Sequence, residues 1–290
     1  MADKKDIDEF SGIETTGHDW DGIKELNNPL PRWWLWTFYA TIVFAIGYSI
    51  AYPAWPGISG ASKGLLGWSS RANVSADLAS VEASRSVLGE RILAMDLADI
   101  EADADLLQFA VAGGASAFKV NCSQCHGAGA AGGGGYPNLL DDDWIWGGDL
   151  EQIYLTLQHG IRYDADEDTR LSDMPAFGAD QILERSDILD VAWYVRQISG
   201  QEHDAEAALR GQTVYEDNCA ACHGDSGAGE PDLGAPNIND AIWLYGGSYE
   251  EIIAQISKPQ QGVMPGWADR LSGATTKQLA IYVHSLGGGE

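Results

Sequence analysis

The chain has 290 residues, of which 45% are hydrophobic, and its 43 acidic residues against 17 lysines and arginines give a net charge of −26 at pH 7. We expect so acidic a chain to bind no nucleic acid, because phosphates must be neutralised by cationic side chains. Its 4 cysteines all fall within two short motifs, so none is left for a structural disulfide.

The first predicted elements are a polar amino-terminal segment over residues 1–32 and a transmembrane helix over residues 33–52. The twenty residues of this helix carry no charge, and at about 1.5 Å per residue they reach roughly 30 Å, enough to cross a bilayer. Aromatic residues at both ends, among them Trp33 and Trp55, are typical of membrane interfaces. A cleaved signal peptide is the alternative, but the acidic leader and the long apolar run favour a retained anchor.

Residues 53–104 are predicted to form a linker outside the membrane that is partly helical. Apolar residues recur at helical spacing among small and acidic residues between Val74 and Ile100, which indicates an amphipathic helix. This helix would be either a docking surface for a partner subunit or a solvated stalk, and the sequence leaves both interpretations open.

Two copies of Cys-x-x-Cys-His follow, at residues 122–126 and 219–223. Residues i and i+3 share one face of a helix, so both sulfurs can bond to one porphyrin edge while the histidine points at the iron. We therefore predict two covalently bound c-type haems. The predicted attachment and ligand residues are Cys122, Cys125 and His126 for one haem, and Cys219, Cys222 and His223 for the other.

Two other kinds of site use cysteine pairs. A redox-active dithiol needs no histidine as its next residue, and a zinc ribbon would bring its two pairs closer than the 97 positions that separate these. Both alternatives explain the doubled motif less well than haem attachment does.

Two of the 4 methionines recur in one context, Met174 in Met-Pro-Ala-Phe and Met264 in Met-Pro-Gly-Trp. A thioether on the second face of each haem would saturate the iron, which could then carry electrons without binding oxygen. The alternative is that both methionines are ordinary core residues. His159 and His284 are weaker candidates for the sixth ligand, because neither has a counterpart in the other repeat. The histidines expected to be bystanders are His18 and His203.

The stretches 105–200 and 201–290 are predicted to be similar domains that arose by duplication. Both carry an aromatic residue before the motif, a Pro-Asn pair, a Trp-x-x-Gly-Gly segment and a final apolar helix with a central tyrosine. Domains this small bury little core of their own, and a haem compensates by serving as core. Helical periodicity predicts helices over residues 149–158, 187–197, 249–257 and 276–286.

These features resemble class I cytochrome c domains in tandem, over about residues 105–290. The resemblance implies an all-α fold behind a single amino-terminal transmembrane helix, with each haem largely buried. Matched in chain order, it implies His126 and Met174 as axial ligands of the first haem, and His223 and Met264 as those of the second. If the domains pack face to face, each methionine could cross to the other iron, and the sequence leaves this open.

The segment from His18 to Trp34 closely resembles the amino-terminal signature of the dihaem subunit family, called CcoP or FixP, of bacterial cbb3-type cytochrome c oxidases. That family implies a subunit that accepts electrons from a soluble or membrane-bound cytochrome c. The electrons would pass to a mono-haem subunit and then to a catalytic haem-copper subunit that reduces oxygen in aerobic or microaerobic respiration. With six scattered histidines and one span, this chain is expected to be part of an enzyme only within that complex.

Covalent haem attachment of this type takes place outside the bacterial cytoplasm, as the cytochrome c resemblance implies. We therefore expect an inner-membrane protein with a cytoplasmic amino terminus and periplasmic haem domains. Residues 53–290 contain 13 basic and 35 acidic residues, and this negative field would speed encounter with a basic cytochrome. The acidic runs 141–143 and 164–168 are the first candidates for that contact, although ordinary solubility is an alternative explanation of the charge.

Two other functional classes stay open at this point. The chain could be the cytochrome c subunit of a periplasmic dehydrogenase, which would carry electrons in the opposite direction. It could also be a dihaem peroxidase, which needs one iron with a vacant position.

Overall fold

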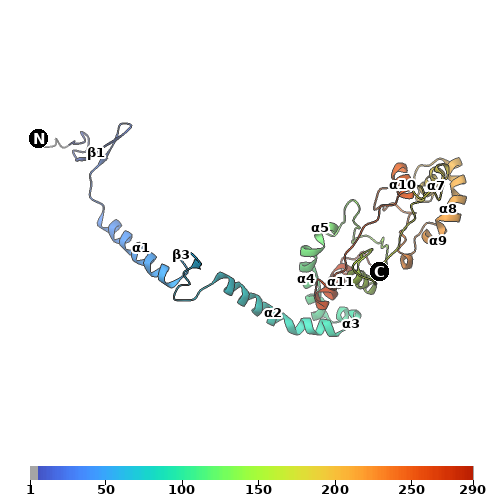
Figure 1. Cartoon of the computed structure of the whole chain (residues 1–290), viewed down its shortest axis with the longest axis horizontal. Coiled ribbons are helices and arrows are strands. Elements are labelled where there is room, and N and C mark those ends of the chain that lie inside the picture. The colour runs from blue at the N-terminus through green and yellow to red at the C-terminus, as the bar shows by residue number, and fades with distance from the viewer. Residues whose placement is uncertain (1–5, 290) are drawn as a thin grey trace. The chain divides into compact units, whose positions relative to one another are not determined.

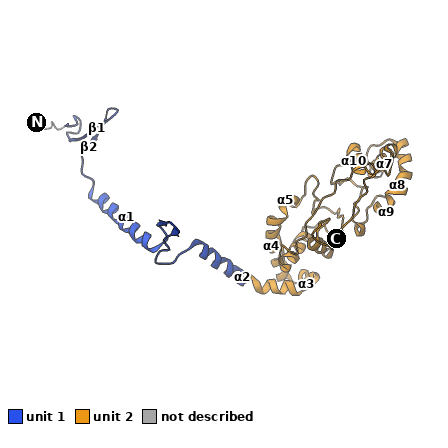
Figure 2. Ribbon diagram, viewed as in Figure 1, with its two compact units in different colours: residues 1–83 blue, residues 84–290 orange. Residues whose placement is uncertain are grey.

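The computed structural model describes residues 6–289, and its internal contacts divide the chain into two compact units, residues 1–83 and residues 84–290 (Figures 1 and 2). The division falls within the long helix α2 (Ser70–Ala94). Residues 1–5, at the start of the predicted amino-terminal segment, and residue 290, at the end of the predicted second domain, lie outside the described residues.

The first unit begins with an antiparallel hairpin of β1 (Thr15–Trp20) and β2 (Ile23–Leu26). Its two turn residues, Asp21 and Gly22, have φ values of +50° and +88°. Positive φ at both central residues is what a type I′ turn requires, and Asp-Gly is a preferred pair for it. The predicted cytoplasmic segment therefore contains a small folded ribbon.

The predicted membrane span forms helix α1 (Arg32–Ala51), one residue earlier than expected at each end. It starts directly after Pro31 and ends where Tyr52 becomes extended before a proline, a position that disfavours helix. None of its residues is buried by protein, and within the described part of the chain it is the one helix long and apolar enough to cross a membrane.

A short loop closes the carboxyl end of α1. The amides of Leu65 and Leu66 donate to the carbonyls of Ile50 and Ala51 at 2.9 and 3.0 Å. These bonds satisfy acceptors that the end of a helix otherwise leaves without partners. The loop contains a second ribbon, made of β3 (Pro56–Gly57) and β4 (Gly60–Ala61).

The linker helix is interrupted, so the prediction of one helix over Val74–Ile100 is wrong. α2 ends at Ala94, and α3 (Leu97–Ala102) begins after the extended residue Asp96. The amine of Lys277 supports the break, because it donates to the carbonyls of Leu93 at 3.1 Å and of Met95. Around the break the linker is neither a solvated stalk nor a free docking surface. Its buried residues, which join a core with the first cytochrome helix, are Ile92 before the break and Leu97 and Ile100 after it.

The rest of the second unit is helical, which confirms the all-α prediction. Aspartate and serine side chains accept amide hydrogen bonds at the starts of five of these helices, as N-caps commonly do. The helices are α4 (Ala104–Asn121), α5 (Ser123–His126), α6 (Leu150–His159), α7 (Arg185–Ile198), α8 (Ala205–Asn218), α9 (Ala220–His223), α10 (Tyr249–Ser257) and α11 (Gly273–His284), with a 3-10 turn η1 (Pro231–Leu233).

The two predicted domains of this unit, residues 105–200 and 201–290, exchange their last helices, α7 and α11. α4 packs against α11, and α8 packs against α7 (Figure 1). α6 also contacts α11, and α10 contacts α7. We call α4, α5, α6 and α11 the first fold, and α7, α8, α9 and α10 the second fold. The domain ranges 105–200 and 201–290 stay predictions. The helix packing crosses the boundary between these ranges, because α4 contacts α11 and α8 contacts α7.

Each exchanged helix pair meets at a glycine. A Cβ atom at Gly114 of α4 would lie 2.2 Å from the Gln278 carbonyl oxygen, and one at Gly211 of α8 would lie 2.1 Å from that of Asp190. Glycine is therefore required for the backbones to approach this closely. Beside these crossings, equivalent aromatic rings pair at centroid distances of 5.5 and 5.1 Å. The ring pairs are Phe118 with Tyr282, and Tyr215 with Tyr194.

Candidate functional site

The first attachment motif lies where α4 ends and the single turn α5 begins. Cys122 caps α4 and is buried, whereas Cys125 is exposed one turn later. The Nδ1 atom of His126 lies 3.1 Å from the carbonyl oxygen of Pro137. Because a carbonyl only accepts, Nδ1 carries the proton in this bond, and Nε2 is left with its lone pair. His126 is thus held in the tautomer that binds a metal through Nε2.

The second motif repeats this geometry. Cys219 caps α8, and Cys222 is exposed on α9. The Nδ1 atom of His223 lies 3.0 Å from the carbonyl oxygen of Pro236. The carbonyls of His126 and His223 each accept an amide bond from a glycine of the following loop, at 2.8 and 2.9 Å. The predicted duplication therefore extends to the orientation of both imidazoles.

Burial favours the uncharged form of the histidine and of the first cysteine in each motif. It lowers the pKa of His126 and of His223, although the bonds to the proline carbonyls oppose this. Burial also raises the pKa of Cys122 and of Cys219 to about 11. A redox-active dithiol shows the opposite, a thiol pKa below its ordinary value. Neutral imidazole with paired thiols on one helical face fits a covalently held haem.

Each methionine packs in the helix group that contains the other domain's cysteine motif, and not in the group that chain order implies. Met264 is half-buried against the hydrophobic cluster that contains Cys122 and Phe118. Met174 is half-buried against the cluster that contains Cys219 and Tyr215. Each methionine thus packs against the cluster of the other domain's cysteine motif.

The Met264 segment is held by hydrogen bonds to the last turn of α6 and to the residues directly after it. Ile161 and Met264 exchange two backbone hydrogen bonds, of 2.9 and 3.0 Å, and the Trp267 amide donates to Leu157 at 2.9 Å. Gly160, with φ +72°, lies so close that a Cβ there would be 2.2 Å from the Met264 carbonyl oxygen. Elements of the first predicted cytochrome domain thus fix a methionine of the second.

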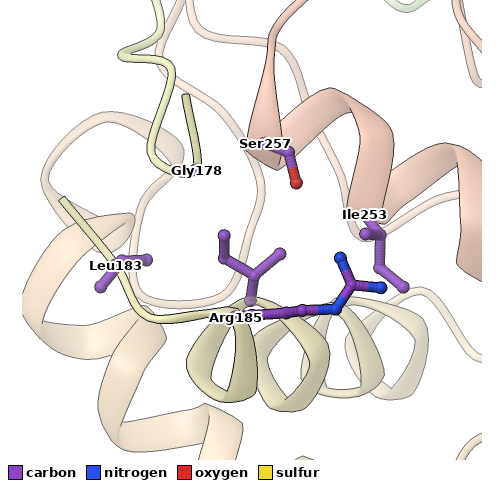
Figure 3. Close-up of a pocket in the computed structure, with 6 residues that line it drawn as sticks. Gly178, Leu183, Arg185, Ile253 and Ser257 are labelled. Carbon is purple, nitrogen blue, oxygen red and sulfur yellow. The ribbon is translucent and has the colours of Figure 1, made fainter. Parts of the chain in front are cut away.

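The Met174 segment is held in the same way by the end of α10. The amide of Ala179 donates to the Ser257 carbonyl at 2.9 Å, and Gln261 Nε2 donates to the Met174 carbonyl at 3.3 Å. Gly178, four residues after Met174, lines a pocket (Figure 3), and neither cysteine motif contributes to the lining of that pocket. The pocket residues are Gly178, Leu183, Arg185, Ile188, Ile253 and Ser257.

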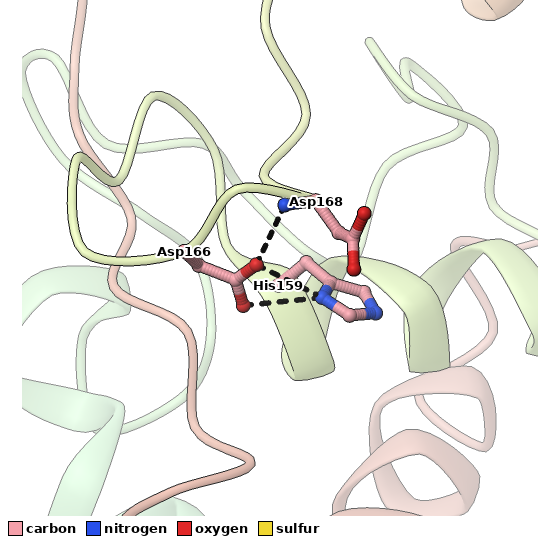
Figure 4. Close-up of side chains that lie close together, drawn as sticks. All are labelled: His159, Asp166 and Asp168. Carbon is pink, nitrogen blue, oxygen red and sulfur yellow. Dashed lines mark hydrogen bonds and ion pairs between the residues drawn. The ribbon is translucent and has the colours of Figure 1, made fainter.

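The two weaker ligand candidates bond to carboxylates of the chain. His159 Nδ1 lies 3.1 Å from Asp166, whose other oxygen accepts the Asp168 amide at 2.8 Å (Figure 4). His284 Nδ1 lies 3.0 Å from Glu101. His159 and Asp166 thereby close the loop that follows α6.

The acidic runs face partly inward. Asp143 is half-buried, and its pKa is raised to about 6 by burial and then by the charges of Asp240, Asp141 and Asp142. Asp166 of the second run faces His159. Only part of each predicted contact run is therefore available to a partner.

Arg170 is a site residue that the sequence analysis missed. Its guanidinium lies over the Trp146 ring at 5.2 Å and donates to the Trp146 carbonyl at 2.9 Å. Its Nε atom is buried without a hydrogen-bond partner among the described residues, and burial lowers its pKa. The guanidinium also donates to Gln152 of α6, and its remaining Nε–H donor fits an anionic group such as a haem carboxylate. No spacing in the sequence marks this arginine.

Three family models match the chain: "N-terminal domain of cytochrome oxidase-cbb3, FixP" over residues 12–59, "Cytochrome c" over 111–199, and "Cytochrome C oxidase, cbb3-type, subunit III" over 206–283. The last two confirm the prediction of two cytochrome c domains in tandem.

Curated relatives extend the similarity over the whole chain. The cbb3-type cytochrome c oxidase subunit CcoP of Cereibacter sphaeroides is 55% identical over 276 residues, 95% of both chains. The subunit FixPc of Rhizobium leguminosarum bv. viciae is 55% identical over 99% of both chains, and FixP of Rhizobium meliloti is 53% identical over 100% of both. None of these relatives is a dehydrogenase subunit or a peroxidase, so those two alternatives receive no support.

Proposed function

Because the chain belongs to the CcoP/FixP family of cbb3-type cytochrome c oxidase subunits, we propose that it binds two c-type haems that relay electrons from a cytochrome c to the catalytic subunits. The observation that carries the proposal is the doubled motif, in which each histidine is fixed through Nδ1 on a proline carbonyl. The cysteines of each motif would form the two thioether bonds.

His126 and Met264 would hold the iron of the haem attached at Cys122, and His223 and Met174 would hold the iron of the haem attached at Cys219. The packing of each methionine against the cluster of the opposite half supports this exchange. When bound, each haem supplies a one-electron carrier, whose potential a thioether ligand raises. The chain orients the imidazole, covers the haem face and excludes water.

Oxygen reduction would take place in other subunits, because both irons are saturated by this chain. The immediate partners are the mono-haem cytochrome c subunit and the haem-copper subunit. The donor is a soluble or membrane-bound cytochrome c, and the charge of −22 carried by residues 53–290 suits a basic donor.

The chain is anchored in the membrane by α1. The proposed topology is that of a single-pass protein of the bacterial inner membrane, with the amino terminus cytoplasmic and residues 53–290 periplasmic. It follows from the need to attach haem outside the cytoplasm.

The test compares ligand variants in a chain reduced to one haem. The full-length protein should retain two haems per chain after denaturation, and the double variant Cys219→Ala, Cys222→Ala should retain one. In that background Met264→His should lower the potential of the remaining haem by on the order of 100 mV, since axial ligands tune haem potentials over about 0.8 V. Met174→His in the same background is the matched control and should change it little.

Redox titration followed by optical spectra measures both effects. A fall in potential with Met174→His instead of Met264→His would restore the chain-order assignment and reject the exchange. Retention of no covalent haem would reject the proposed function as a whole.

A further inference from the structure

A single side chain joins the two methionine segments. The Nε atom of Arg162 donates to the Gly262 carbonyl at 2.8 Å, and its Nη1 atom donates to the Ser172 carbonyl at 2.9 Å. Gly262 lies two residues before Met264, and Ser172 lies two residues before Met174. The same guanidinium thus contacts equivalent positions in segments that are 90 residues apart in the sequence.

The backbone around Arg162 fixes where its side chain starts. Arg162 has a left-handed φ of +50°, and its amide donates to the Arg170 carbonyl at 2.9 Å. Its neighbour Ile161 makes the two backbone bonds to Met264. Gln261 adds a direct link between the segments through its bond to the Met174 carbonyl. The side chain therefore extends from a point already attached to one methionine segment and reaches the other.

Arginine suits this position for a physical reason. Its planar fork presents several N–H donors in fixed directions, so one cation can serve two carbonyls that face it from different sides. A lysine ammonium keeps the charge but cannot reproduce the geometry of the fork. Charged donors also make stronger hydrogen bonds than neutral ones.

We propose that Arg162 is a positioning residue that couples the sixth-ligand segments of the two haems. Because one guanidinium holds both carbonyls, movement of either segment weakens the support of the other. Release of one methionine from its iron should therefore make release of the other more favourable. This inference rests on the proposed function, in which Met264 and Met174 are the sixth ligands.

The experiment uses the full-length holoprotein in detergent and the weak red absorption band that reports methionine sulfur on ferric haem. Arg162→Lys is placed in two backgrounds, Met174→His and Met264→His, each of which leaves one methionine-ligated haem. On warming, each protein loses its remaining methionine band with a measurable equilibrium constant. The constant of each Arg162→Lys variant is compared with the constant of the same background that keeps Arg162. We expect this constant to rise about ten-fold or more in both backgrounds, the size of effect that loss of a charged hydrogen bond produces.

The matched control is Arg196→Lys. Arg196 also donates from Nε to a backbone carbonyl, that of Glu202 at 2.8 Å, and stacks on Trp193. It contacts neither methionine segment, so the control should leave both bands unchanged. The same equilibrium constant is measured for Arg162→Gln, which keeps one amide donor. The haem content per chain checks that each variant has folded.

A ten-fold effect in only one background, or in neither, would overturn the coupling and leave the proposed function intact. An equal effect of the Arg196 control would also overturn it. If the unmodified protein lacked the methionine band altogether, the ligand assignment of the proposed function would fail instead.

Discussion

Gly160 combines a positive-φ extended backbone, with φ +72° and ψ −167°, with close contact to the Met264 segment. Replacing it with alanine costs about 1–3 kcal/mol for the backbone conformation alone, and the added Cβ would displace the Met264 carbonyl. We predict that Gly160→Ala removes at least half of the methionine–iron absorption of the holoprotein, which optical spectra of the ferric form would measure.

Gly200 offers the control for this prediction. Its φ of +71° is also positive, but a Cβ there would meet nothing within 4 Å. Gly200→Ala should therefore introduce a side chain at positive φ without a steric contact and leave the methionine band in place. Equal spectra for the two alanine variants would show that contact with the Met264 segment is irrelevant.

Asp143 makes stability depend on pH. Its ordinary pKa of 3.8 is raised to about 6 in the fold, first by burial and then by Asp240, Asp141 and Asp142. Between these values the folded chain holds a proton that the unfolded chain has lost, so the free energy of unfolding falls as pH rises from about 4 to about 6.

Asp143→Asn should remove the fall in the free energy of unfolding that Asp143 causes as pH rises. We expect the variant to be more stable than the parent at about pH 7, by about 1 kcal/mol once solvent screening of this half-buried group is considered, and to gain nothing near pH 4. Urea unfolding at the two pH values measures the difference. The same gain at both values would mean that the carboxylate charge is not the cause.

Single residues differ in how far the sequence identifies them. The cysteines and histidines of the site follow from a local motif whose spacing carries the chemistry. Arg162 and Arg170 have no such spacing, because their roles depend on which distant segments meet around them. Only the folded chain brings Gly262 and Ser172 to one guanidinium.

Local patterns predicted most of the helices, and the errors at this scale have clear causes. The hairpin of β1 and β2 carries a recognisable turn, Asp21-Gly22, but its short strands lack the apolar alternation that usually identifies a strand. The break between α2 and α3 depends on Lys277, which lies far along the chain. Helical periodicity continues across that break and cannot reveal it.

The exchange of helices was beyond prediction for a different reason. Duplication gives α7 and α11 similar tyrosines, and gives α4 and α8 similar glycines and aromatic rings. These matched positions therefore do not identify which pairing forms. The choice between them is made by the connecting segments, whose path a repeat pattern does not encode.

At the scale of the whole molecule, the exchange predicts that neither half folds alone as it does in the full chain. Residues 84–200 lack α11, whose buried Leu279, Ile281 and Val283 belong to the core around α4. Burial of each such side chain contributes about 1.5–3 kcal/mol, and the total is comparable with the stability of a whole domain, roughly 5–15 kcal/mol. We expect this fragment, expressed alone, to yield no monomer with the native haem spectrum.

Size-exclusion chromatography with detection at the haem absorbance tests the fragment. Coexpression with residues 201–290 is the control, because it supplies α11 and should restore a haem-bearing complex of both pieces. A stable monomer of residues 84–200 with a native spectrum would contradict the exchanged packing.

The crossed helices also set an order of maturation. In the proposed topology, export from the amino terminus would deliver the Cys122 motif before α11, the helix that packs against α4. The partner of α8 would already be outside when α8 emerges, since α7 precedes it. The haem-binding motif that comes first along the chain would therefore be the last to complete its helix packing.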